Sequence, residues 1–201
     1  MRTVWTAICL TTLLACNASA DPLAQQAEEK AEALEHAVAT QDTSKPAPAE
    51  TITPIEAKAV DPNGAAALDD TLTCLARTIY WESKGASDKD MQAVAHVVLN
   101  RVGHDGFPDT VCAVVKDGSE RKACQFSWWC DGRADQTKED EPYLQAKEIA
   151  RKVLNRQLPD NSRGALYFHD RNVHPSWAKE YTKTAETKKF LFYKPTGGDA
   201  R

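Results

Sequence analysis

The sequence of 201 residues lacks the motifs on which several large enzyme classes depend. It contains no G-x-S-x-G nucleophile elbow, no glycine-rich phosphate loop and no H-E-x-x-H zinc motif. The serine hydrolase, nucleotide-binding and zincin classes are therefore not indicated. No C-x-x-C pair occurs either, which argues against a zinc site with ribbon-like spacing. We expect a protein without a cofactor or a bound metal.

Long apolar runs and a clear excess of positive charge are also missing. After residue 20 no segment approaches the roughly 20 apolar residues that a membrane-spanning helix needs. Residues 69–201 contain 21 Lys and Arg against 20 Asp and Glu, a net charge of +1. Phosphate binding would need a clustered excess of basic residues. We therefore predict no membrane span and no nucleic-acid partner.

The first 20 residues have the pattern of a secretory signal peptide. A basic start at Arg2 precedes an apolar run over residues 4–15 and small residues at positions 18–20. This pattern predicts export across the inner membrane to the periplasm. The segment Leu13-Leu14-Ala15-Cys16 also resembles a bacterial lipobox, so a lipid anchor on Cys16 is the alternative.

Residues 21–68 contain no aromatic residue, five prolines and nine acidic residues. Such a composition buries too little apolar surface to order a chain, so we predict a disordered spacer. The predicted folded domain, residues 69–201, holds four of the five tryptophans and all tyrosines and phenylalanines. That is enough for one hydrophobic core.

Four cysteines remain once the signal peptide is removed. An even number in an exported domain favours two disulfides over metal binding. The spacing does not choose among the three pairings of Cys74, Cys112, Cys124 and Cys130.

The stretch from Leu72 to Gly85 predicts a helix with a carboxyl group on its apolar side. Glu82 lies seven residues after Leu75, on the face that the apolar spacing i, i+3, i+4, i+7 buries. Gly85 predicts the end of the helix, so Glu82 lies in a last turn that disfavours negative charge. Burial and the helix dipole both raise the pKa of Glu82, as a general acid requires. A structural ion pair with a nearby arginine is the alternative.

The rest of the domain reads as helices followed by a small sheet. A cap at Ser87 begins a helix that extends to Val102, and two further helices are predicted from Pro108 to near Gly118 and from Asp140 to Leu154. Aromatic-rich stretches at residues 165–169 and 190–193 predict strands. This order describes an α+β domain that is mainly helical.

Two aromatic and polar clusters are candidate sugar-binding elements. The first, residues 124–132, supplies Gln125, Ser127 and Trp128, because flat aromatic faces beside amides and hydroxyls suit a sugar ring. At least one of its aromatic residues is expected in the core. The second cluster consists of Tyr167, His169, His174 and Trp177. A metal held by His169, Asp170 and His174 is conceivable, yet three ligands on a loop without a fourth are weak evidence.

Several segments together resemble the SleB/CwlJ-type cell wall hydrolase family, in its cysteine-bearing proteobacterial form. The resemblance covers residues 72–193 and rests on ARTIYWESKG (76–85), AVAHVVLNRV (93–102), FPDTV (107–111), QFS (125–127), GALYFH (164–169) and PSW (175–177). It implies a lysozyme-like α+β domain with a small antiparallel sheet, which cuts the glycan strands of peptidoglycan with Glu82 as the catalytic acid. Residues 82–85 (ESKG), Tyr167 and residues 188–193 (KKFLFY) depart from the common family pattern.

The number of carboxylates decides what mechanism we expect. Hydrolytic glycosidases usually use two. Asp131, which follows the QFS block, is the second acid that we consider, and capping a turn before Gly132 is the favoured interpretation of it. Glu82 alone suffices if it first protonates the glycosidic oxygen and then deprotonates the C6 hydroxyl of N-acetylmuramic acid. We expect a lytic transglycosylase or muramidase, with Tyr80, Gln125 and Ser127 contacting the glycan. The alternatives are a peptidoglycan-binding scaffold and a zinc-dependent amidase that uses His169 and His174.

Overall fold

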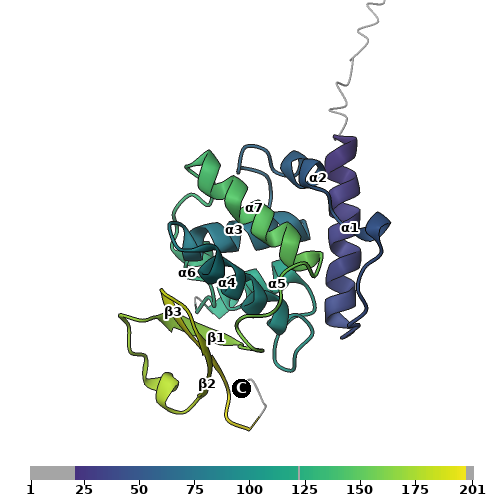
Figure 1. Cartoon of the computed structure of the whole chain (residues 1–201). Helices are drawn as coiled ribbons and strands as arrows, with labels where there is room; N and C mark the ends of the chain where they lie inside the picture. Colours follow the sequence, from purple (N-terminus) through teal and green to yellow (C-terminus); the bar gives the residue numbers. More distant parts are fainter. Residues whose placement is uncertain (1–20, 122, 198–201) are drawn as a thin grey trace, which may run out of the picture.

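The computed structural model of the protein describes residues 21–121 and 123–197. The predicted signal peptide, with Cys16, lies outside the described residues. The elements in chain order are α1 (Pro22–Ala39), η1 (Pro48–Glu50), α2 (Pro54–Ala59), α3 (Thr71–Ser83), α4 (Asp88–Arg101), α5 (Val111–Lys116), η2 (Ser119–Arg121), α6 (Ser127–Cys130), α7 (Asp140–Leu154), β1 (Tyr167–Asp170), η3 (Ser176–Lys179), β2 (Thr182–Glu186) and β3 (Phe190–Lys194) (Figure 1). None of the described helices combines the length and the apolar character needed to cross a membrane.

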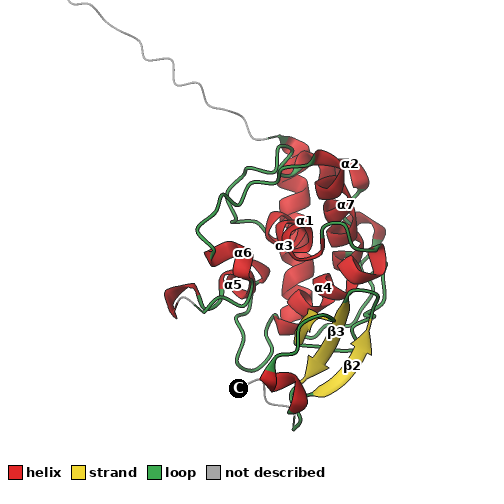
Figure 2. Ribbon diagram, turned by 90° about the vertical axis from the view of Figure 1, so that its left-hand side faces the viewer, coloured by secondary structure: helices red, strands yellow, loops and turns green. Residues whose placement is uncertain are grey.

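The helices form one layer around α3, and the sheet lies beside that layer. Helix α3 packs against α4, α5 and α7, and α1 lies along the side of the bundle that faces away from the sheet (Figures 1 and 2). Leu72, Leu75 and Ile79 of α3 are fully buried in this core. The apolar spacing that predicted a buried face for residues 72–85 is confirmed.

Local capping explains where the predicted helices begin. The Asp70 carboxylate accepts a hydrogen bond from the Thr73 amide at 2.8 Å at the start of α3. Ser87 and Asp90 form the expected capping box of α4, and Thr110 caps α5. Gly85 has φ +77°, a left-handed conformation that ends α3 at low steric cost.

The sheet has the order β1-β3-β2 with both pairings antiparallel. Phe168 of β1 lies opposite Phe192 of β3, and Phe192 packs with Val94 and Val97 of α4. Strands β1 and β3 match the predicted positions, and the small antiparallel sheet beside a mainly helical layer confirms the predicted fold class. Strand β2 has no counterpart in the sequence prediction.

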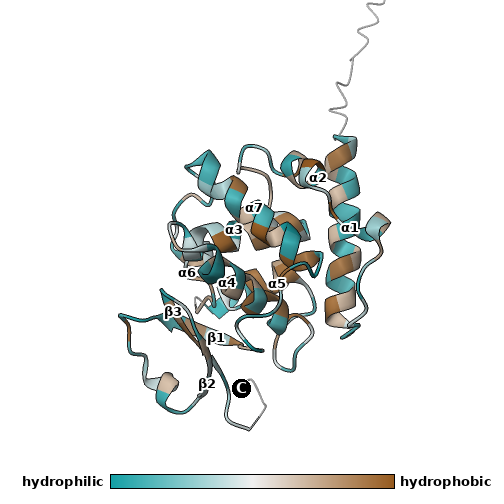
Figure 3. Cartoon of the chain, in the orientation of Figure 1, coloured by the Kyte–Doolittle hydropathy of each residue, from teal (hydrophilic) through white to brown (hydrophobic). Residues whose placement is uncertain are grey.

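The prediction of a disordered spacer over residues 21–68 is wrong. This segment forms α1, η1 and α2, and α1 presents a mixed apolar and polar surface along its length (Figure 3). Ala27 and Ala31 are fully buried and Leu34 is 5 % exposed. Small side chains let α1 approach the bundle closely, so the apolar surface that orders the segment belongs largely to its neighbours.

Polar side chains of the domain also hold this segment. The Asn155 side chain accepts from the Ile52 amide at 2.9 Å and donates to the Ile52 carbonyl at 2.8 Å. Lys147 donates to the Val60 carbonyl at 3.0 Å. Within the segment itself, Lys30 of α1 forms an ion pair with Glu56 of α2 at 2.8 Å. Buried polar groups are costly without such partners, so residues 21–68 pack as part of the same core.

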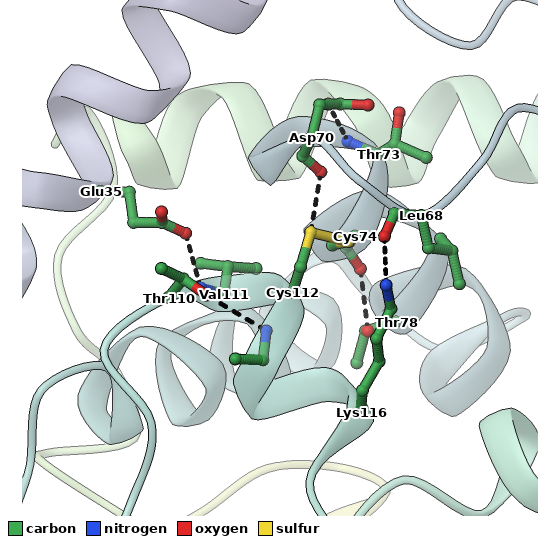
Figure 4. Close-up of a disulfide and its surroundings, with 11 residues drawn as sticks. Glu35, Leu68, Asp70, Thr73, Cys74, Thr78, Thr110, Val111, Cys112 and Lys116 are labelled. Atoms are coloured by element: carbon green, nitrogen blue, oxygen red, sulfur yellow. Dashed lines mark hydrogen bonds between the residues drawn. A yellow bond between two sulfur atoms is a disulfide. The ribbon is translucent and has the colours of Figure 1, made fainter. Parts of the chain in front are cut away.

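Two disulfides resolve the open question of cysteine pairing. Cys74 pairs with Cys112 and Cys124 pairs with Cys130. The first joins α3 to α5, and Figure 4 shows Glu35 of α1 reaching the start of α5 beside it. There the Glu35 carboxylate accepts a hydrogen bond from the Val111 amide at 2.5 Å. The second disulfide closes a short loop that contributes to the site described next.

Candidate active site

A cleft of about 610 Å³ contains the predicted catalytic acid. It is formed by the end of α3, the end of α4, the loop before α6, β1, the region of η3 and the start of β3. Its lining residues are Glu82, Arg101, Cys124, Gln125, Ser127, Tyr167, Phe168, His169, Asp170, Trp177, Tyr181, Lys189 and Phe190.

Glu82 lies in the last turn of α3, where the residue is partly exposed to the cleft and its carboxyl group is largely withdrawn from solvent. Burial raises the pKa of this carboxyl from 4.5 to about 7, against the opposing positive charges of Arg101 and Lys189. No described residue forms an ion pair with Glu82 within 4.0 Å. The structural ion pair considered as an alternative is therefore not found among the described residues.

The loop closed by Cys124 and Cys130 brings Gln125 and Ser127 into the cleft, as predicted. Trp128 is not there. Its side chain is 6 % exposed and packs in the core, because the segment forms the short helix α6 and turns this side chain inward. The prediction of Trp128 as a sugar-contacting residue is wrong, and the expectation that one aromatic residue of this cluster is buried is confirmed.

Tyr80 is also misplaced by the sequence prediction. It is fully buried, its hydroxyl donates to Glu139, and the same oxygen accepts from the Lys138 amide at 3.0 Å. Residues two apart on a helix point about 200° away from each other. Tyr80 consequently faces the α7 side of α3, where its ring contacts Tyr143, while Glu82 faces the cleft.

An aromatic group lines the side of the cleft near the sheet. The rings of Tyr167 and Trp177 lie 5.8 Å apart, those of Trp177 and Tyr181 lie 5.4 Å apart, and His169 stacks on Tyr193 at 5.2 Å. Tyr167 and His169 were predicted from the sequence. Tyr181 was missed because it stands alone between η3 and β2 with no pattern around it.

The histidines of this region do not form a metal site. Nδ1 of His169 lies 2.8 Å from the Asp170 carbonyl and Nε2 lies 3.2 Å from the Tyr193 hydroxyl, while His174 is exposed. Within residues 21–121 and 123–197, no group of three or more His, Cys, Asp or Glu side chains could hold a metal ion. The amidase alternative has no ligand set in this part of the chain.

Asp131 and Asp170 are the two other acidic residues considered for the site, and they lie in different surroundings. Asp131 accepts a hydrogen bond from the Arg133 amide at 2.8 Å and caps an exposed turn, as the favoured interpretation stated. Asp170 lines the cleft, where its Oδ1 accepts from the backbone and side-chain nitrogens of Asn172, both at 2.9 Å. From the sequence alone, Asp170 is a candidate only as a metal ligand.

Comparisons with known proteins identify the family and support the fold. A family model described as cell wall hydrolase matches residues 85–193, a range that begins just after Glu82. The catalytic domain of the Bacillus cereus SleB protein is 28 % identical, with a TM-score of 0.51 over 66 % of this chain and 94 % of that one. The catalytic domain of the germination-specific lytic transglycosylase SleB from Bacillus anthracis is 27 % identical, with a TM-score of 0.51 over 66 % of this chain and 99 % of that one. No curated protein matches the chain significantly.

Proposed function

This chain belongs to the cell wall hydrolase family, and from that premise we propose that it cleaves peptidoglycan glycan strands after N-acetylmuramic acid, as a lytic transglycosylase with Glu82 as acid and then base. The observation that carries the proposal is a carboxyl group without an ion-pair partner among the described residues, raised to a pKa of about 7, in a cleft lined by aromatic residues. The likeness to a SleB lytic transglycosylase domain supports it.

In the proposed reaction Glu82 first donates a proton and then takes one back. Protonated Glu82 donates to the glycosidic oxygen while the bond from that oxygen to C1 of N-acetylmuramic acid breaks. The C6 hydroxyl of the same sugar then attacks C1, and the Glu82 carboxylate takes the hydroxyl proton. The products are a 1,6-anhydro end and a new free hydroxyl, no water is consumed, and Glu82 ends protonated as it began.

The carboxylates around the cleft favour this route over hydrolysis. A hydrolytic mechanism usually uses a second carboxylate that is free to act on water or on C1. One oxygen of Asp170 already accepts two hydrogen bonds from Asn172 at the end of β1, and Asp131 caps an exposed turn away from the cleft lining. Among the described acidic residues that line the cleft, Glu82 is the one without such hydrogen bonds.

The aromatic and polar residues suit a sugar polymer. Trp177 and Tyr181 supply ring faces, and Gln125 and Ser127 supply hydrogen-bonding groups to the same cleft. Aromatic faces bind the apolar sides of sugar rings, while amides and hydroxyls fix their orientation. We expect Trp177→Ala to weaken binding to the glycan more than it lowers turnover of the bound glycan.

The test is digestion of purified peptidoglycan sacculi, with the released fragments identified by mass spectrometry. Wild type is expected to release anhydromuropeptides, and Glu82→Gln is expected to lower the rate by at least about 100-fold. Asp131→Asn is the matched control, because its carboxylate is exposed and removed from the cleft lining, and it is expected to retain activity.

Two other results of this digestion would contradict the proposed function. Reducing muramic ends that disappear in Asp170→Asn would replace the proposed route by hydrolysis with two carboxylates. Binding of wild type and Glu82→Gln to sacculi with no fragments from either would refute the enzymatic role and favour a binding scaffold.

Export is part of the same proposal. The signal-like residues 1–20 support it, and so do two disulfides, since disulfides persist mainly in oxidising compartments such as the periplasm. The mass of the mature protein's N-terminal peptide distinguishes cleavage after Ala20 from a lipid-bearing Cys16.

A further inference from the structure

Arg101 is a buried cation for which no ion pair is found among the described residues. It is the last residue of α4, it lines the cleft, and it is 3 % exposed. Its Nε donates to the Leu166 carbonyl at 2.8 Å, and its Nη1 is buried without a hydrogen-bond partner. Among the described residues no Asp or Glu lies within 4.0 Å of the guanidinium.

Three aromatic rings hold this guanidinium in place. Its Cζ lies 5.2 Å from the ring centre of Phe107, 5.1 Å from that of Phe126 and 5.5 Å from that of Tyr167. Aromatic faces attract a cation but do not cancel its charge as a carboxylate would. The position of the charge is therefore fixed, while much of its electrostatic potential remains available to the cleft.

Arg77 shows how the same fold treats an arginine that is purely structural. It is buried to a similar degree, at 1 % exposure, and it pairs with Asp61 at 2.8 Å and with the Ala66 and Asp135 carbonyls. A buried charge without a comparable partner is expensive. Arg101 has no comparable partner among the described residues, which indicates a role other than a structural one.

The charged and titratable groups around Arg101 come from several elements. Glu82 is contributed by α3, Tyr167 by β1 and Asp117 by the residue that follows α5, and each favours the charged form of Arg101. Burial lowers the pKa of Arg101 to about 10, so the group stays protonated at neutral pH. Lys189, His169 and Asp170 line the same cleft, and Lys189 also favours the ionised form of Glu82.

We propose that Arg101 is the positioning residue for the proton cycle of Glu82: its caged charge stabilises the Glu82 carboxylate between donation of the proton to the glycosidic oxygen and recovery of a proton from the C6 hydroxyl. This inference rests on the proposed function. A neutral Glu82 gains little from the guanidinium, while an ionised Glu82 in a largely buried site gains much. The stabilisation therefore develops as the bond breaks, which is when it lowers the barrier.

The first test compares Arg101→Met with Arg101→Lys, which keeps the charge. The Glu82 carboxyl is followed by carbon-13 NMR in glutamate-labelled full-length protein, with Glu82→Gln to assign its resonance. Arg101→Met is expected to raise the measured pKa of Glu82 by about one unit. In the pH profile of kcat/KM on sacculi, Arg101→Met should shift the alkaline limb to higher pH by the same amount. It should also lower kcat on the order of 100-fold. Arg101→Lys should return the alkaline limb most of the way to its wild-type pH.

A second measurement needs no arginine variant, in case Arg101→Met fails to fold. The Nε–H of Arg101 is held by the Leu166 carbonyl, so its nitrogen-15 resonance should titrate with the pKa of Glu82 in wild type and stop titrating in Glu82→Gln.

The outcomes separate the two claims. If wild type is active but Arg101→Met changes neither the pKa of Glu82 nor the alkaline limb of the pH profile, only the role of Arg101 is overturned. The same holds if the Nε resonance of Arg101 does not titrate with Glu82. A wild type without turnover would overturn the proposed function, and this role with it.

Discussion

The buried carboxylate of Asp61 offers a sharp test of whether residues 21–68 belong to the folded core. Its Oδ2 lies 2.8 Å from Nη2 of Arg77 and accepts from the Tyr143 hydroxyl at 2.6 Å, and its Oδ1 accepts from the Ala65 and Ala66 amides at 2.8 Å each. The side chains of Asp61 and Arg77 are both 1 % exposed. Asp61→Ala removes the acceptor and leaves Arg77 charged and buried.

The expected loss of stability is large. Removing one partner of a buried ion pair costs about 3–5 kcal/mol, a large share of the 5–15 kcal/mol that is typical of a whole domain. For a chain of this size, about 2–4 °C in Tm accompanies each kcal/mol. We therefore expect Asp61→Ala to melt about 6–20 °C below wild type.

Denaturant unfolding followed by near-ultraviolet circular dichroism measures this loss with both disulfides intact. Arg133→Ala is the control, because Arg133 is 85 % exposed and its 4.0 Å contact with Asp131 should contribute less than about 1 kcal/mol. A loss below about 1 kcal/mol for Asp61→Ala would refute the assignment of this segment to the core.

The pH dependence gives an independent check on Asp61. Its hydrogen bonds and the Arg77 charge hold the pKa of the folded-state carboxyl below 3.8, in spite of burial. A carboxyl with a lowered pKa stabilises the fold above its unfolded-state value and loses this contribution as the pH falls through its folded-state value. The gap in stability between wild type and Asp61→Asn should therefore be fully present at pH 6 and shrink on acidification below about pH 4.

Three further predictions follow from the same geometry. Glu82→Gln should raise stability at pH 8 by up to about 3 kcal/mol and have little effect at pH 4, because the raised pKa of Glu82 makes its ionisation destabilising between pH 4.5 and about 7; equal denaturation midpoints at pH 8 would contradict this. Replacing Cys74 and Cys112 by serine should cost about 4 kcal/mol of stability for a separation of 38 residues. Replacing Cys124 and Cys130 should cost about 2 kcal/mol but lower activity more, since their loop carries Gln125 and Ser127. Denaturation and sacculus digestion of the two double variants check both parts. A chain of residues 69–201 should lack a dispersed amide NMR spectrum, because Arg77, Lys147 and Asn155 lose partners in residues 21–68; a dispersed spectrum with the stability of residues 21–201 would contradict this.

Much of the domain can be predicted from the sequence because its helices carry local signals. Ser87 and Asp90 mark the start of α4 within one turn, and the spacing of Leu72, Leu75 and Ile79 identifies the buried face of α3. The same face places Glu82 in the cleft. These features depend on residues close together in the chain, so no knowledge of tertiary partners is needed.

The missed elements depend on distant partners. Helix α1 buries Ala27 and Ala31, residues whose small apolar area gives a weak signal, and it is ordered by surface that α3 and α7 supply. Strand β2 has the sequence TKTAE and lies at the sheet edge with an exposed pattern, so no apolar alternation marks it. Arg101 reads as an ordinary basic residue in the last turn of a helix until the fold surrounds it with aromatic rings.

Helix α3 connects stability with chemistry, because Arg77 and Glu82 lie on the same rigid element. Asp61 forms an ion pair with Arg77 on the side that faces residues 21–68, while no described residue forms an ion pair with Glu82 on the side that faces the cleft. The ion pair with Asp61 fixes the helix whose last turn must hold the Glu82 carboxyl in position. Residues 21–68 therefore contribute to the site without reaching it. Asp61→Ala should accordingly lower turnover on sacculi well below the temperature at which the variant unfolds, and the wild-type rate at 20 °C in a folded Asp61→Ala protein would refute this link.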